Sequence, residues 1–132
     1  MAGDASSYLR NKLVDHSLGT TAYAKPAAVY LAAFVGDPGS TGVEVAGNGY
    51  ARQAVTFNAS SGSGENPCAA ASNADATFPV ATGSWGTVDN LALYDAATGG
   101  DLLWYGPMTV SKSIGLGDQL KVASGNFTVS LS

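Results

Sequence analysis

The sequence contains little charge. Only 12% of its 132 residues are Asp, Glu, Lys or Arg, about half of the usual share of about 25%. The formal net charge is −4, and the six cations are scattered along the chain. Nucleic-acid binding needs clustered Lys and Arg to neutralise phosphates, so we expect no nucleic-acid partner. Hydrophobic residues still make up 45% of the chain, which argues against disorder and allows a single domain of residues 1–132 to bury one core.

Residues that carry covalent or metal chemistry are equally scarce. Cys68 is the only cysteine, so an internal disulfide is excluded. His16 is the only histidine, and one His with one Cys cannot build a zinc site of the usual kind. A Ser-His-Asp triad would have to use His16, for which a structural role is the favoured interpretation. We therefore expect no catalytic residue, no metal and no cofactor, and we interpret the protein as non-enzymatic.

Long apolar runs are absent as well. No stretch approaches the roughly 18 apolar residues that cross a bilayer, so we expect no membrane partner. Near the N-terminus, Leu13-Val14 is followed at once by Asp15-His16, which is unlike the apolar core of a signal peptide. We therefore expect a soluble protein made in the cytosol.

What the sequence does contain is short runs of alternating or apolar residues separated by Gly-rich turns. Period-2 alternation places successive side chains on opposite faces of a sheet. Asn48-Gly49, between runs at 43–46 and 50–57, is the strongest short hairpin signal, and residues 95–101 join runs at 85–94 and 102–105 in a second hairpin. Further runs lie at 27–34, 74–80, 107–110, 119–122 and 126–131. The pattern predicts a mainly β fold, an antiparallel sandwich or small barrel of about eight strands with one N-terminal helix.

Three segments depart from the strand pattern. Residues 1–6 are predicted to form a free arm, so that deleting residues 1–7 leaves the fold intact. Ser6 or Ser7 is a suitable cap for a helix over residues 7–18 that ends at Gly19. Leu9 and Leu13 give this helix a narrow apolar stripe. Residues 58–73 are rich in Ser and Gly and are predicted to be a flexible loop.

Two groups of residues admit a functional interpretation beside a structural one. Asp89, Asp95 and Asp101 suit a calcium site only if their oxygens converge in one short loop, and turn-forming Asp is the favoured alternative. Four aromatic residues of one predicted hairpin are candidates for a sugar-binding face, although packing in the core or an interface is favoured: Trp85, Tyr94, Trp104 and Tyr105.

Several blocks of the sequence resemble small virion proteins of tailed bacteriophages. These are Tyr8 to His16, Ala22-Tyr23, Pro26 to Ala32, Gly49 to Phe57, and the segment from Thr77 through Ser84-Trp85-Gly86 to Trp104-Tyr105-Gly106. Such proteins are commonly labelled phage tail-fibre or virion structural proteins. The resemblance implies a virion component, assembled in the host cytoplasm, with no catalytic residues to carry over.

Within the particle, a short and repeat-free chain favours a capsid decoration (cement) protein over a long trimeric fibre. The expected partners are the phage major capsid protein and copies of the chain itself, as a trimer or other small homo-oligomer. A tail-fibre or baseplate subunit is the alternative, and a carbohydrate-binding module for host glycans is a second one. We expect partner contacts from Tyr8, Leu9, Leu13, Tyr23, Trp85, Trp104 and Tyr105.

Overall fold

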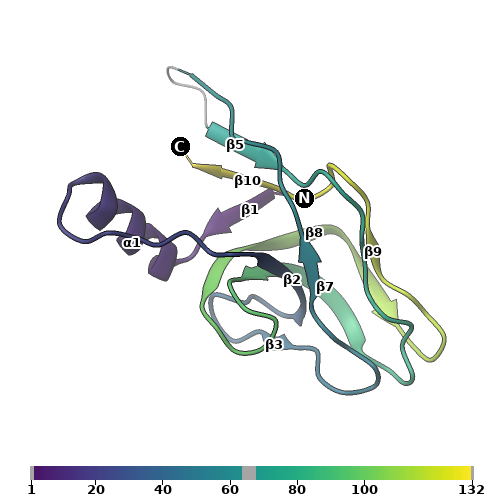
Figure 1. The fold of residues 1–132 in the computed structure, drawn as a ribbon. Helices are drawn as coiled ribbons and strands as arrows, with labels where there is room; N and C mark the ends of the chain where they lie inside the picture. Colours follow the sequence, from purple (N-terminus) through teal and green to yellow (C-terminus); the bar gives the residue numbers. More distant parts are fainter. Residues whose placement is uncertain (1, 64–67, 132) are drawn as a thin grey trace.

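The computed structural model describes residues 2–63 and 68–131, in which the strands form two sheets and one helix projects to the side (Figure 1). Strands account for 42% of the described residues and helix for 9%, which confirms the predicted mainly β fold with an N-terminal helix. The elements are β1 (Ala2–Ala5), α1 (Ser7–Ser17), β2 (Val29–Val35), β3 (Val43–Glu44), β4 (Gln53–Val55), β5 (Cys68–Ala71), β6 (Ala76–Thr77), β7 (Gly86–Tyr94), β8 (Leu102–Ile114), β9 (Lys121–Val122) and β10 (Thr128–Leu131).

The larger sheet has eight strands in the order β3-β2-β7-β8-β1-β10-β5, with β4 also paired to β2. It is not closed into a barrel, so the sandwich alternative describes it better. β6 and β9 form a second, two-stranded sheet, and their Ala76 and Val122 share one buried core with Leu31 and Leu91 of the larger sheet. The pairing is antiparallel except between β1 and β10, which are parallel, so the prediction of a purely antiparallel sheet is wrong at that pair.

Strand β2 is buried on both faces, as its apolar run predicts. Leu31 and Ala33 belong to the main core, whereas Ala32 and Phe34 pack with Ala92 on the opposite face. Because alternate side chains of a strand point to opposite faces, a strand covered on both sides has to be apolar at consecutive positions.

Most of the free N-terminal arm predicted for residues 1–6 forms strand β1, while Met1 lies outside the described residues. Asp4 and Ala5 pair with β8, while Ala2 and Gly3 leave β8 and pair with β10. The prediction of an arm was wrong because four small and polar residues carry no alternation long enough to indicate a strand. Deleting residues 1–7 would remove the strand that joins β8 to β10, so the fold is not expected to survive it intact.

Helix α1 begins and ends close to the predicted positions 7–18. Ser6 is the N-cap, and its hydroxyl oxygen accepts a hydrogen bond from the Leu9 amide at 3.2 Å. Gly19, just after the helix, has a φ of +75°, a conformation that favours glycine at a helix C-terminus. The local capping signals were therefore sufficient to place this element.

Strand β8 is one element of 13 residues, although the sequence pattern predicts separate strands at 102–105 and 107–110. Pro107 pairs with Asn90, and Lys112 pairs with Val88. Four residues of β8 therefore lie opposite a single residue of β7, and this bulge lets the strand continue past Pro107, which cannot donate a backbone hydrogen bond.

The hairpin predicted around Asn48-Gly49 is wrong in its pairing, although the turn itself forms. Asn48 and Gly49 both have positive φ, and the Tyr50 amide donates to the Gly47 carbonyl at 3.1 Å. However, β3 and β4 both pair with β2 and not with each other. The alternation on either side of the turn correctly predicted two strands, but burial against β2 decided which strand each of them pairs with.

The predicted loop at 58–73 contains strand β5, which pairs with β10. Ser61 pairs with Ala69, and Phe57 pairs with Ser72, so residues beside β5 also take part in backbone pairing. The Gly64-to-Pro67 part of that prediction lies outside the described residues. A loop over the whole of 58–73 was wrong because small residues such as Ala69 and Ala70 give a weak strand signal.

Candidate interaction surface at helix α1

Helix α1 is attached to the sheet through a small apolar cluster. Leu9 is 4% exposed and packs with Ala5 of β1 and Leu103 of β8. Tyr8, Leu13, Tyr23 and Trp104 are partly buried around this cluster. The structure thereby brings together five of the seven residues from which the sequence predicts partner contacts: Tyr8, Leu9 and Leu13 of α1, Tyr23 of the segment that follows it, and Trp104 of β8.

The far end of the helix is not covered. Val14 is 54% exposed and Leu18 is 73% exposed, and in Figure 1 α1 projects away from the sheets. The end is held in shape locally, because the Leu18 amide donates to the Val14 carbonyl at 3.1 Å and the Tyr23 amide donates to Nδ1 of His16 at 3.1 Å. His16 therefore has a structural contact, and the outer part of α1 presents apolar side chains on a formed framework.

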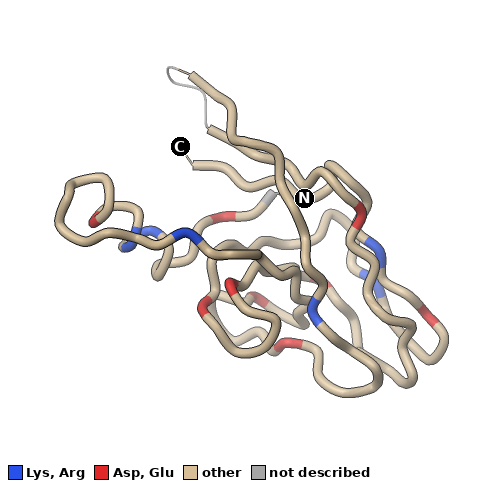
Figure 2. The backbone as a smooth tube through the Cα atoms, in the orientation of Figure 1, with Lys and Arg blue, Asp and Glu red and all other residues tan. Residues whose placement is uncertain are grey.

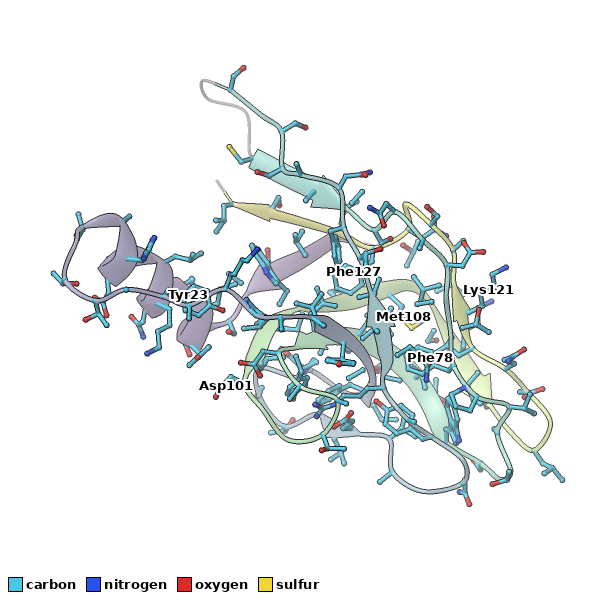
Figure 3. The ribbon with its side chains drawn as sticks, viewed as in Figure 1. Tyr23, Phe78, Asp101, Met108, Lys121 and Phe127 are labelled. Atoms are coloured by element: carbon cyan, nitrogen blue, oxygen red, sulfur yellow. The ribbon has the colours of Figure 1, made fainter. Side chains whose placement is uncertain are left out.

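We define the α1 surface as Tyr8, Leu13, Val14, Leu18 and Tyr23. Burial raises the pKa of Tyr8 and of Tyr23 above the usual value, and the nearby carboxylates of Asp95 and Asp101 raise both further. Figure 3 shows Tyr23 and Asp101 on the helix side of the molecule. Both phenols therefore stay neutral at ordinary pH and keep their hydroxyl hydrogens as donors.

The carboxylates beside the α1 surface belong to the turn between β7 and β8. Oδ1 of Asp95 accepts a hydrogen bond from the Asp101 amide at 2.8 Å, which makes Asp95 a turn-forming residue. Asp89 lies within β7, and its Oδ1 accepts a hydrogen bond from the Gly36 amide, just after β2, at 2.8 Å. No group of three or more metal-ligating side chains occurs among residues 2–63 and 68–131. Asp95 thus has the turn-forming role that the sequence favoured, and Asp89 links β7 to the end of β2.

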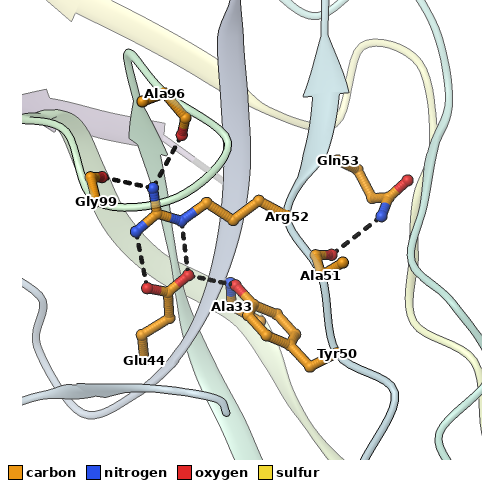
Figure 4. Close-up of polar contacts among 8 residues, drawn as sticks. All are labelled: Ala33, Glu44, Tyr50, Ala51, Arg52, Gln53, Ala96 and Gly99. Carbon is orange, nitrogen blue, oxygen red and sulfur yellow. Dashed lines mark hydrogen bonds and ion pairs between the residues drawn. The ribbon is translucent and has the colours of Figure 1, made fainter. Parts of the chain in front are cut away.

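A polar cluster that was not predicted from the sequence holds this turn in place (Figure 4). The Arg52 guanidinium donates to the carbonyls of Ala96 and Gly99 at 2.9 and 2.7 Å. It also forms a bidentate pair with Glu44, with Nε–Oε2 and Nη2–Oε1 both at 2.8 Å. Such bidentate pairs are strong and fix geometry. No local spacing indicated the cluster, because its members come together only through the pairing of β3 and β4 with β2.

The remaining predicted contact residues lie elsewhere. Trp85 is 5% exposed, and its indole Nε1 donates to the Asn48 carbonyl at 2.9 Å, so it serves the internal packing. Tyr105 follows Trp104 in β8 and packs with Ala92 on the opposite face. The rings named as a possible sugar-binding face therefore do not share one face. That all seven residues contact a partner remains a prediction.

Tyr105 also borders a cleft of about 310 Å³ beside the start of α1. Tyr8, Arg10 and Pro38 line the same cleft. A Cβ atom on Gly39 would come within 2.5 Å of the Tyr105 ring, so the turn at 37–39 can approach this ring only because residue 39 is glycine. Tyr8 of α1 and Tyr105 of β8 thus line the same cleft at one edge of the α1 surface.

Other features bear on the kind of protein this is. Cys68 is an exposed free thiol. Within the part of the chain that the structure describes, no helix has the length and apolar character needed to span a membrane. The buried interior is aliphatic and aromatic, and no buried side-chain polar atom among the described residues lacks a hydrogen-bond partner. The described part of the chain is thus a β-rich fold built around an apolar core.

Comparison with known families agrees with this class. The family model described as Podophage GP4 fiber I protein gp80 matches residues 4–130, so the chain belongs to that family of phage virion structural proteins. No match is found among curated proteins. Membership confirms the resemblance to phage virion proteins that several sequence blocks indicated, and it identifies the chain as a virion component with a structural role.

Proposed function

We propose that the protein is a non-enzymatic structural subunit of a phage tail fibre. The observation that carries the proposal is the match over residues 4–130 to a family described as a podophage fibre protein. The description favours the tail-fibre alternative over capsid decoration, which was the first expectation from the sequence. One physical argument for decoration, a free N-terminal arm that binds the shell, is also removed because Ala2–Ala5 form β1 within the sheet.

In this role the α1 surface would contact neighbouring copies of the chain. Val14 and Leu18 place apolar groups in solvent. Covering these groups in an assembly would stabilise it by about 25 cal/mol for each Å² of apolar surface buried. A specific interface needs about 800 Å² on each partner, more than one helix offers, so the adjoining Tyr8 and Tyr23 would have to take part. A trimer or another small homo-oligomer is the proposed arrangement.

The location is tested by labelling purified virions with gold-conjugated antibodies raised against this protein. The fibre role predicts label confined to the tail. Label spread evenly over the head would refute it and would favour the decoration role, in which the major capsid protein is the partner.

The contact surface is tested with the double variant Val14→Ser/Leu18→Ser, measured by light scattering after size-exclusion chromatography. We expect a shift from oligomer toward monomer with an unchanged circular dichroism spectrum. Leu116→Ser is the matched control, because Leu116 is 78% exposed in a turn remote from α1. Equal oligomerisation of the double variant and the wild type would contradict the role of the α1 surface.

A further inference from the structure

The larger sheet splits where β1 changes partner. Asp4 and Ala5 pair with Tyr105 and Trp104 of β8, but Ala2 and Gly3 pair with β10. Beyond Gly106, the only strand paired with β8 among the described residues is β7. The outer edge of β8 from Pro107 to Ser113 is therefore open, and an open edge presents backbone N–H and C=O groups that another strand can pair with.

A groove of about 310 Å³ lies beside this open edge, between β8 and β9. Met108, Leu91 and Val122 provide apolar side chains to its lining. Lys112 of β8 and Lys121 of β9 also line it. In Figure 2 two basic positions lie close together where β8 and β9 run, and Figure 3 shows Lys121 on the side of the molecule away from Tyr23. The groove is thus a basic site remote from the α1 surface.

The positive charge of the groove stands out against the rest of the chain. The chain has six cations and a formal net charge of −4, yet two of the six cations line this one groove. Lys121 has a partial counter-ion in Asp75, with Nζ–Oδ2 at 3.3 Å and both side chains about half exposed. Within residues 2–63 and 68–131, Lys112 takes part in neither of the two salt bridges. An anionic partner would therefore find complementary charge here.

We propose that this groove binds an extended acidic peptide segment of a neighbouring virion subunit, which adds to the open edge of β8 as a further strand. Main-chain hydrogen bonds supply affinity in this mode of recognition, and side-chain pockets supply specificity. Lysine and a bulge on an edge strand normally discourage pairing with other strands. The carboxylates of an acidic segment would attract the lysine side chain. The lysine and the bulge therefore discourage pairing with most strands and favour an acidic one.

A peptide fits this groove better than an acidic saccharide. None of the residues that line the groove is aromatic, so a sugar ring would have no ring face to stack on. A saccharide also has no regular series of amide donors and acceptors to match a strand edge. In an extended peptide, every second residue points its N–H and C=O groups toward the same neighbouring strand.

The probe for the test is a fluorescein-labelled peptide, Thr-Glu-Val-Asp-Val-Thr, whose binding to the full chain is followed by fluorescence anisotropy. Lys112→Gln/Lys121→Gln should weaken binding about 2- to 25-fold, because each exposed ion pair contributes roughly 1.5- to 5-fold. Lys25→Gln is the matched control, since it removes one exposed charge outside the groove, and it should leave affinity unchanged. Amide signals in NMR spectra should shift at 108–113 and 121–126.

Four results would overturn the proposal. These are no binding of the acidic peptide up to about 1 mM, equal binding of the Gln/Asn version of the peptide, equal binding of a version N-methylated at alternate residues, or stronger binding of an oligogalacturonate than of the peptide. The proposal depends on the fibre role in one respect, which is that the acidic peptide belongs to another virion subunit. Because peptide binding is measured on the isolated chain and location on the virion, failure of one is distinguishable from failure of the other.

Discussion

The hydroxyl group of Tyr50 takes the place of a missing backbone partner. The Val45 amide donates to the Ala33 carbonyl at 3.0 Å, as in an antiparallel pair, but the chain then leaves β2 to form the turn at Asn48-Gly49. The Ala33 amide donates instead to the Tyr50 hydroxyl oxygen at 3.0 Å. That hydroxyl in turn donates to Oε2 of Glu44 at 2.7 Å. We therefore expect Tyr50→Phe, which removes only the hydroxyl oxygen and its two hydrogen bonds, to destabilise the fold.

The size of the effect follows from burial. Ala33 is fully buried, so its N–H would be left unpaired at a cost of about 1–3 kcal/mol. Glu44 would keep both hydrogen bonds from Arg52, so the loss on that side is smaller. The phenyl ring would retain its contacts with Phe78 and Trp85, whose centroids lie 6.0 and 5.4 Å away. We expect a total loss of about 2–3 kcal/mol, a large share of the usual stability of about 5–15 kcal/mol.

The assay is urea unfolding followed by tryptophan fluorescence, with hydrogen exchange of the Ala33 amide as a local readout. Tyr30→Phe is the matched control, because Tyr30 lies on the same strand and no side-chain hydrogen bond is assigned to it; its substitution should change stability by less than about 0.5 kcal/mol. If Tyr50→Phe proves as stable as Tyr30→Phe and the Ala33 amide exchanges at the wild-type rate, the reasoning is refuted.

Two further predictions concern the Arg52 cluster and the helix cap. Burial alone would raise the pKa of Glu44, but hydrogen bonds from Arg52 and Tyr50 outweigh it and lower the pKa below its ordinary value of 4.5. The stability that this shift contributes is present above pH 4.5 and is lost as the pH falls through the lowered pKa. In thermal unfolding, the advantage of the wild type over Glu44→Gln should therefore shrink between pH 7 and pH 3, and a constant difference would contradict this account. Ser6→Ala removes the acceptor of the Leu9 amide and the hydroxyl donor to the Leu102 carbonyl at 2.5 Å, which should cost about 1–2 kcal/mol in urea unfolding; a loss no greater than that of Ser7→Ala would count against it.

Elements defined by neighbouring residues were predicted well from the sequence. The helix from Ser7 follows from its cap, and the turn at Asn48-Gly49 follows from the tolerance of these residues for positive φ. Strand β2 was predicted as buried on both faces because its residues are apolar at consecutive positions. Each of these signals lies within a few residues of the chain, and the physical interactions that produce it act over the same short range.

Only one of the two predicted hairpin pairings is confirmed: β7 pairs with β8 across the turn at 95–101, whereas β3 and β4 pair with β2 and not with each other. Ala2–Ala5 shows no strand pattern, yet its backbone pairs with β8 and β10 because the two strands approach it from the far end of the chain. The two predicted strands around Pro107 are one, because β7 supports the chain on either side of the bulge. The hydroxyl of Ser6 meets the Leu102 carbonyl across 96 residues, a contact that no local pattern indicates.

The sequence by itself determined the fold class, the turns, the helix and the phage virion family, because these depend on alternation, on the conformational freedom of particular residues and on shared sequence blocks. Only the tertiary structure decided that Leu9 of α1 packs against Ala5 and Leu103, that Arg52 holds the turn carrying Asp95, and that β8 has an open basic edge. The physical reason is that burial selects the partner of each strand from the whole chain, and the two surfaces of this protein arise from that selection.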